Sequence, residues 1–314
     1  MHLEAVPSLS PVRPVICIGG VVWESNFSVD HFPGRGVKLL PRDARQMASG
    51  MAPAAAATLA RLGQAVELWS VVGDDGNGAN ACADLAREGI GVAHVQRLQG
   101  AATPFSSVLV DPAGERLVVP FFDPALYGAA ALEALPLHRV AQAASVLADL
   151  RWVDGAEAVL RQARADGVPT VLDADVAPRD VLERLLPLAD HVLFSEVALH
   201  SLEADGAPRE ALLRLAARLE IAQVVGVTLG GHGALIWQRG QRGAVAHFAA
   251  PPIRAVDTLN AGDVWHGAYV HGLVAGLDMA ARIPLANMAA AIKCERPWGR
   301  LGAPTLTEVR ARLG

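Results

Sequence analysis

The strongest constraint on the fold is a regular alternation of short apolar strands with helices between residues 145 and 228. Alternation at this spacing implies a parallel sheet with helices on both faces, because each crossover between parallel strands passes over the sheet. The first part of the chain continues the pattern, with a β-branched run at 15–20 and a strand at 67–72. We therefore expect an α/β fold with one large, doubly wound, mostly parallel sheet. The other expected strands are Ser145–Leu150, Pro169–Asp173, His191–Ser195 and Gln223–Thr228, and the expected helices are Pro53–Leu62, Asn77–Glu88, Ala156–Ala165, Arg179–Leu186 and Arg209–Leu219.

Two β-rich segments, near residues 24–48 and 103–123, do not fit this layered pattern. The second contains a hairpin whose strands, Phe105–Val110 and Glu115–Phe121, flank an Asp-Pro-Ala-Gly turn. We expect both segments to form a small β-sheet lid inserted into a single domain that spans residues 1–314. Because such a lid presents exposed strand edges, pairing of two lids would bury them, which predicts a homodimer.

Charge and hydropathy exclude several classes of protein. Lys and Arg number 27 against 32 Asp and Glu, so the chain lacks the basic surplus typical of nucleic-acid binders. No stretch approaches the roughly 18 consecutive apolar residues of a membrane span, and the N-terminus lacks the basic and apolar regions of a signal peptide. Three scattered cysteines and ten histidines without paired spacing favour neither a disulfide framework nor a zinc site. We expect a cytoplasmic protein without nucleic-acid or membrane partners.

The segment 255–268 is the clearest candidate for chemistry. The residues Asn260, Ala261 and Gly262 allow backbone amides to converge at the start of a helix. Together with the helix dipole, those amides form an anion site suited to a phosphate in transfer. Asp263, in the first helical turn, is then a candidate general base for a hydroxyl. On these residues alone, the alternative is that Asp263 only stabilises the start of the helix through the helix dipole.

Four short motifs lie along the chain in a fixed order. They are Ser-Gly-x-x-x-Ala-x-Ala-x-x-x-Ala-Arg-Leu-Gly at 49–63, Val-Gly-Asp-Asp-x-x-Gly at 72–78, Val-Thr-Leu-Gly-x-x-Gly at 227–233 and Asp-Thr-Leu-Asn-Ala-Gly-Asp at 257–263. In sequence and order they resemble the signatures of the PfkB, or ribokinase-like, carbohydrate kinases. The chain has no G-x-x-x-x-G-K-[ST], so it is not a P-loop kinase.

This resemblance implies a ribokinase-like fold and an ATP-dependent sugar kinase, with Mg²⁺ held through the ATP phosphates. It implies Asp263 as the base and the amides of Asn260, Ala261 and Gly262 as the anion hole. The implied nucleotide contacts are Thr228, Gly230, Gly233 and Asn287; the implied sugar contacts are Glu24, Lys38, Gly50 and Arg151. The resemblance also implies that Glu196 and Asp257 lie near the magnesium without coordinating it directly.

Further segments, at 148–156, 170–175, 194–196 and 293–300, resemble the sulfofructose kinase branch, which is close to ketohexokinases. The resemblance to this branch implies that Lys38 on the lid and Arg151 after a sheet strand face each other across the sugar cleft. Two cations there favour a sugar with an anionic end, because an arginine fork matches sulfonate or phosphate oxygens. We expect phosphorylation of a primary hydroxyl of a ketose, with 6-deoxy-6-sulfofructose as the leading candidate.

Several residues depart from the family pattern, among them Ser49, which replaces a glycine, and Ser195, which begins the segment that replaces the usual N-x-x-E. Glu24 stands where the family has Asp, Ala54 replaces an asparagine, and Asn260 replaces a glycine, although Asn tolerates a positive φ. These departures leave other substrates open: fructose or another ketohexose, 2-keto-3-deoxygluconate, phosphofructose or tagatose, and nucleosides. They also leave open a sugar- or nucleotide-binding sensor without catalysis.

Overall fold

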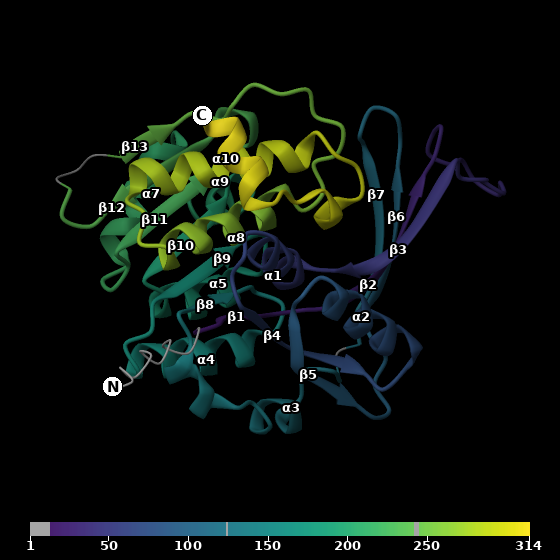
Figure 1. The fold of residues 1–314 in the computed structure, drawn as a ribbon, viewed down its shortest axis with the longest axis horizontal. Helices are drawn as coiled ribbons and strands as arrows, with labels where there is room; N and C mark the ends of the chain where they lie inside the picture. Colours follow the sequence, from purple (N-terminus) through teal and green to yellow (C-terminus); the bar gives the residue numbers. More distant parts are fainter. Residues whose placement is uncertain (1–12, 124, 242–244) are drawn as a thin grey trace, which may run out of the picture.

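The computed structural model describes residues 13–123, 125–241 and 245–314, and its core is a nine-stranded sheet (Figure 1). Seven strands, from β11 to β5, are parallel, and β12 and β13 form an antiparallel edge. The predicted α/β, mostly parallel fold is confirmed. In spatial order the strands are β13 (Val245–Phe248), β12 (Ala234–Gln238), β11 (Val224–Thr228), β10 (His191–Ser195), β9 (Thr170–Ala174), β8 (Ser145–Ala148), β1 (Val15–Ile18), β4 (Val66–Gly73) and β5 (Gly91–Leu98).

Helices cover both faces of this sheet, and each face has its own apolar core. In β1, Val15 and Cys17 pack into one core while Ile16 and Ile18 pack into the other, as the alternation of side chains along a strand requires. The helices of the first core are α1 (Met51–Arg61), α2 (Gly76–Arg87), α8 (Ala261–Val274), α9 (Met279–Cys294) and α10 (Leu306–Leu313). The helices of the second are α3 (Ala129–Glu133), α4 (Val153–Ala165), α5 (Arg179–Leu185), α6 (Glu196–Leu202) and α7 (Pro208–Arg218). Short 3₁₀ helices are η1 (Leu137–Gln142), η2 (Leu186–Leu188), η3 (Gly230–His232) and η4 (Gly299–Gly302).

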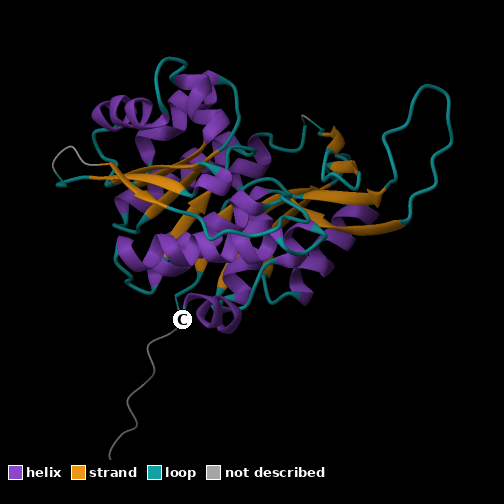
Figure 2. Cartoon of the chain, turned by 90° about the horizontal axis from the view of Figure 1, so that it is seen from above, coloured by secondary structure: helices purple, strands orange, loops and turns teal. Residues whose placement is uncertain are grey.

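A second, four-stranded sheet stands beside the large one (Figure 1). Its order is β3 (Asp43–Ser49), β2 (Val22–Ser28), β6 (Phe105–Val110) and β7 (Arg116–Phe121). These strands come from the two segments that the sequence sets apart from the layered pattern. The loop 29–42, between β2 and β3, extends away from the large sheet (Figure 2).

Residues 91–98, for which no strand was expected from the sequence, form β5. This strand lies at the edge of the large sheet, where Val95 is buried and its other side chains are partly buried or exposed. An edge strand needs fewer apolar residues than a central one, so its hydrophobic signal is weak. Within the described residues, no helix combines the length and hydropathy needed to cross a membrane.

The chain changes direction across the sheet between β1 and β8. From β1 it proceeds to β4 and β5 on one side, and from β8 to β9, β10 and β11 on the other. Such a switch point opens a crevice at the carboxyl ends of the strands, which is where ligands bind in open α/β sheets. The first residues beyond β1 and β8 are Gly19 and Asp149.

Asp149 is buried in this crevice and joins three segments of the chain. Its Oδ2 accepts the amides of Gly20 at 3.2 Å and Ala52 at 3.1 Å, and its Oδ1 accepts the amide of Arg151 at 2.8 Å. Burial raises the pKa of Asp149, while these bonds and the Arg151 charge act in the opposite direction. A single carboxylate thus holds the start of the small sheet, the start of α1 and the end of β8 together.

Gly19 is expected to tolerate no side chain, because a Cβ there would lie 2.0 Å from Oδ2 of Asp149. Gly19→Ala should therefore lower the free energy of unfolding by roughly 1–3 kcal/mol or more, as overpacking of a close contact does. Gly76→Ala is the matched control, because no heavy atom lies within 4 Å of a Cβ at that position. Urea unfolding of both variants measures the difference; equal stabilities would contradict the tight fit around Asp149.

Candidate active site

Three hollows adjoin at the carboxyl end of the large sheet, and Asp263 borders two of them. The first, an apolar cavity of about 330 Å³, includes Ile253, Trp265 and Ala290 in its walls. The second, an acidic cavity of about 370 Å³, is lined by carboxylates that include Asp263. The third, a junction cavity of about 200 Å³, lies between the two sheets and also reaches Asp263. A molecule in the junction cavity and one in the acidic cavity would therefore meet at Asp263.

The start of α8 has the conformation that an anion site requires. Asn260 adopts a left-handed conformation with φ 60° and ψ 16°, and its Nδ2 donates to Oδ2 of Asp263 at 2.7 Å. Among the described residues, no backbone carbonyl accepts the amides of Gly262 and Asp263. The amide of Ala261, by contrast, donates to the Thr258 carbonyl at 3.2 Å. Ala261 is therefore less available to an anion in this structure than the sequence analysis supposes.

The Asp263 carboxyl has a pKa of about 7, well above its usual range. Burial is the main cause, and the neighbouring Asp173 raises the pKa further because two negative charges in one site repel each other. The hydrogen bond from Asn260 and the charge of His266 act in the opposite direction. A carboxyl with this pKa can accept a proton near neutral pH and release it again.

Asp173 and His266 form a buried pair beside Asp263 that the sequence analysis did not single out. Oδ2 of Asp173, at the end of β9, lies 3.2 Å from Nδ1 of His266, one turn after Asp263 on α8. Burial raises the pKa of Asp173 and lowers that of His266. Two features of the sequence could have indicated this pair: an acid at the end of a predicted strand, and a histidine three residues after the candidate base.

The junction cavity brings together three of the four predicted sugar contacts: Glu24, Gly50 and Arg151. Glu24 is buried, and its carboxylate accepts hydrogen bonds from Asn26 at 2.8 Å and from Ser106 at 3.2 Å. Lys38 lies exposed on the loop 29–42 and does not line this cavity. Lys38 and Arg151, which were expected to face each other across the sugar cleft, therefore do not line one cavity in this structure.

Arg151 lines the junction cavity, and its side chain is 40% exposed. Its guanidinium donates to the Val176 carbonyl at 3.3 Å and lies 3.9 Å from Oδ2 of Asp175. Both contacts are long, and an exposed ion pair of this kind contributes little. The guanidinium therefore keeps donors for a ligand.

The predicted nucleotide contacts Thr228, Gly230, Gly233 and Asn287 all line the apolar cavity. Asn287 uses its side chain within the protein. Its Oδ1 accepts Trp265 Nε1 at 2.8 Å, and its Nδ2 donates to the carbonyls of Phe248 and Ala249. Its amide therefore shapes the wall of this cavity.

The two acids expected near a magnesium ion lie in different places. Glu196, the first residue of α6, lines the acidic cavity together with Asp175. Asp257 lines none of the three cavities. Its carboxylate accepts the amides of Leu259 and Gly299, and Lys293 Nζ lies 3.2 Å from it. Asp257 thus anchors the loop before α8.

Comparison with known proteins agrees with this geometry. Residues 14–306 match the pfkB family of carbohydrate kinases. An ATP-dependent ribose-1-phosphate kinase from Halopiger xanaduensis is 28% identical over 95% of this chain and 97% of its own length. The crystal structure of a putative ribokinase from Agrobacterium tumefaciens is 36% identical, with a TM-score of 0.92, over 96% of this chain and 97% of its own. A putative ribokinase II from E. coli in complex with ATP and Mg²⁺ is 22% identical, with a TM-score of 0.81, over 96% of this chain and 99% of its own.

The chain belongs to the pfkB family of carbohydrate kinases. It is an ATP-dependent phosphotransferase that acts on a carbohydrate.

Proposed function

We propose that this kinase places ATP in the apolar and acidic cavities and the sugar in the junction cavity, with Asp263 as general base. The observation that carries the proposal is the position of Asp263. Its carboxyl borders both the junction and the acidic cavities and lies in the first turn of α8. The amides of Gly262 and Asp263, which lack backbone acceptors among the described residues, are suited to the transferred phosphoryl oxygens.

In the proposed reaction, a sugar hydroxyl donates its proton to Asp263 as its oxygen attacks the γ-phosphorus of ATP. The new oxygen–phosphorus bond forms while the bond to the β-phosphate oxygen breaks, which releases ADP and leaves the proton on Asp263. The charge that develops on the phosphoryl oxygens is stabilised by the N-terminus of α8, where Asn260 holds both the turn and the carboxyl of Asp263. Asp263 then returns its proton to solvent.

The acidic cavity suits Mg²⁺ bound mainly through ATP phosphates and water. Mg²⁺ commonly keeps several waters and takes only one or two carboxylates together with substrate phosphates. Asp175 and Glu196 lie in this cavity and would contact the ion's water shell. Among the described residues, no cluster of three or more ligating side chains forms a metal site made by the protein alone. When bound, Mg²⁺ neutralises negative charge on the phosphates.

Loss of the base should slow the chemical step. Asp263→Asn should lower kcat by on the order of 10²–10⁴, the usual contribution of general-base catalysis. In the native enzyme only the ionised carboxylate accepts the proton, so kcat/KM should rise with pH through the Asp263 pKa of about 7 and then level off. Steady-state kinetics from pH 5.5 to 9, with calorimetry showing that ATP still binds, measure both effects. A variant with native turnover would remove Asp263 from this role.

We further propose that the sugar carries an anionic group, with 6-deoxy-6-sulfofructose as the leading candidate. Among the described residues that line the junction cavity, Arg151 is the only cation, and its own contacts are long. Glu24 is already bonded to Asn26 and Ser106, and Ala54 supplies no polar group to a neutral sugar. The relative from Halopiger xanaduensis is a ribose-1-phosphate kinase, whose named substrate is an anionic sugar. Arg151 is the residue proposed to bind the anionic group, because Lys38 does not line the cavity.

A panel of sugars tests the substrate, and one substitution tests its recognition. The panel contains 6-deoxy-6-sulfofructose, ribose 1-phosphate, fructose 1-phosphate, 2-keto-3-deoxygluconate, fructose, ribose and a nucleoside, assayed by ADP release. Charge-assisted bonds contribute roughly 1.5–3 kcal/mol, so Arg151→Met should raise KM for the anionic sugar about 10–150-fold and spare neutral sugars. The matched control is Arg161→Met, which removes an exposed arginine of α4 that pairs with Glu157. A preference of the native enzyme for neutral sugars would overturn the anionic substrate.

The small sheet is proposed to act as a lid and to join two copies of the chain. All six residues of β7 are exposed, and Leu117, Val118, Val119 and Phe121 are each more than 40% accessible. An apolar strand at a sheet edge is a surface that proteins usually cover. A second copy of the same sheet would cover it by symmetry.

Light scattering at micromolar concentration should give twice the monomer mass. Val119→Glu should shift the mass toward the monomer, because it places a charge in the centre of the apolar strand. Leu313→Glu, a substitution of an equally apolar residue that is 44% exposed on α10, should leave the dimer intact. A native monomer, or dissociation by both variants, would contradict association through the small sheet.

A further inference from the structure

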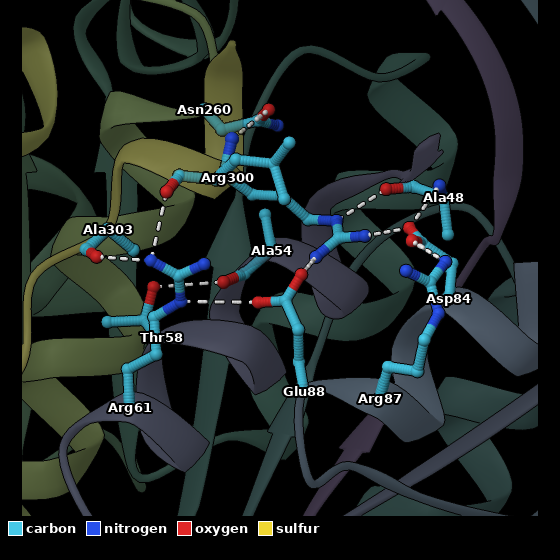
Figure 3. Close-up of polar contacts among 11 residues, drawn as sticks. Ala48, Ala54, Thr58, Arg61, Asp84, Arg87, Glu88, Asn260, Arg300 and Ala303 are labelled. Atoms are coloured by element: carbon cyan, nitrogen blue, oxygen red, sulfur yellow. Dashed lines mark hydrogen bonds and ion pairs between the residues drawn. The ribbon is translucent and has the colours of Figure 1, made fainter. Parts of the chain in front are cut away.

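Arg300, in η4, is fully buried and joins η4 to α2 and β3, which lie more than 200 residues earlier in the chain (Figure 3). Its guanidinium forms ion pairs with Asp84 and Glu88, at the end of α2, and donates from Nε to the Ala48 carbonyl in β3. The planar fork of arginine allows all of these bonds at once, which a lysine ammonium cannot reproduce. Removing one partner from such a buried group leaves an uncompensated charge.

Ala48 is held from both sides at the base of the small sheet. Its carbonyl accepts from Arg300, and its amide donates to Oδ2 of Asp84 at 2.9 Å. The next two residues, Ser49 and Gly50, line the junction cavity. The position of Ala48 therefore determines where the sugar-facing backbone lies relative to α1.

The backbone of Arg300 reaches the proposed anion hole. Its amide donates to Oδ1 of Asn260 at 3.2 Å, while Nδ2 of the same side chain donates to Asp263 at 2.7 Å. The fit is close, since a Cβ on the neighbouring Gly299 would lie 2.6 Å from Oδ1 of Asn260. A continuous series of bonds thus runs from Asp263 through Asn260 and Arg300 to Ala48.

We propose that Arg300 is a positioning residue that couples the nucleotide site to the small sheet, so that occupation of one stabilises the other. The proposal rests on the proposed function, because it takes the start of α8 as the phosphoryl site and the junction cavity as the sugar site. Ordering of Asn260 by a phosphate restrains Arg300, and Arg300 in turn restrains Ala48 and the sugar-facing residues after it. Coupling of this kind is reciprocal: a sugar that orders residues 48–50 must strengthen nucleotide binding by the same factor.

Hydrogen–deuterium exchange with saturating Mg²⁺ and the nonhydrolysable ATP analogue AMP-PNP tests the coupling without a known sugar. In the native protein, AMP-PNP should slow exchange at 228–233 and 258–263, and also at 43–50, by about 5-fold or more, the lower end of usual allosteric coupling. In Arg300→Lys the first two segments should still be protected, whereas 43–50 should show less than a twofold change. A merely structural role would alter exchange at 43–50 equally with and without nucleotide.

Two further variants make the result specific. Arg61→Lys is the matched control, because Arg61 also pairs with Glu88 and donates to the carbonyls of Leu301 and Ala303 but contacts neither Ala48 nor Asn260 (Figure 3). It should keep the native response. Asn260→Gly interrupts the series of bonds at its other end. Glycine fits the positive φ of this position, and the substitution leaves the buried ion pairs of Arg300 intact. In this variant AMP-PNP should no longer slow exchange at 43–50, which tests the proposal even if Arg300→Lys fails to fold.

The outcomes separate the two proposals. One result would be that AMP-PNP slows exchange at 43–50 equally in the native protein and in every variant, along with 228–233 and 258–263. That result would overturn the role of Arg300 and leave the proposed function intact. Protection at 228–233 and 258–263 without any effect at 43–50 in the native protein would also overturn it. No protection at 258–263 would contradict the proposed phosphoryl site, and with it the inference.

Discussion

The geometry of the site depends on the buried carboxylate of Asp149. Three backbone amides converge on it, from the start of the small sheet, the start of α1 and the end of β8. Burying a charged group is costly unless hydrogen bonds compensate, so this carboxylate stabilises only the arrangement in which all three amides reach it. The same arrangement brings Gly20, Gly50 and Arg151 into one cavity. This wall of the junction cavity is therefore built around an acid that does not itself line the cavity.

Charge is distributed on both sides of the start of α8. Asp173, Asp175 and Glu196 line the acidic cavity in front, where they raise the pKa of Asp263 or would contact a metal's water shell. Behind the loop, the buried ammonium of Lys293 donates to the Asp257 carbonyl at 2.6 Å. Acids thus face the side where Mg²⁺ and phosphates are proposed to bind, while a cation stabilises the loop that presents the amides.

Much of the site was predictable because its residues follow strands or begin helices. The resemblance to the PfkB kinases implied Thr228, Gly230 and Gly233 as nucleotide contacts, and they line the cavity that adjoins the acidic cavity. They lie near Asp263 because the carboxyl ends of parallel strands meet at one edge of the sheet. The position of Lys38 was not predictable, because the 14 residues of the loop 29–42 have no periodic pattern that determines their direction. The strand β5 was missed because its apolar residues are mixed with polar ones, as an edge strand permits, and form no continuous run.

The sequence by itself determined the α/β class, the two β-rich segments, and the turn at Asn260 with Asp263 after it. These are local properties: they follow from the spacing of apolar residues and from backbone conformations that Gly and Asn permit. Only the tertiary structure decided that Asp173 pairs with His266, that Asp149 gathers three amides and that Arg300 joins Ala48 to Asn260. Ala48 and Arg300 are 252 residues apart. No local pattern encodes such a contact, because it exists only once the sheet and both helical layers are assembled.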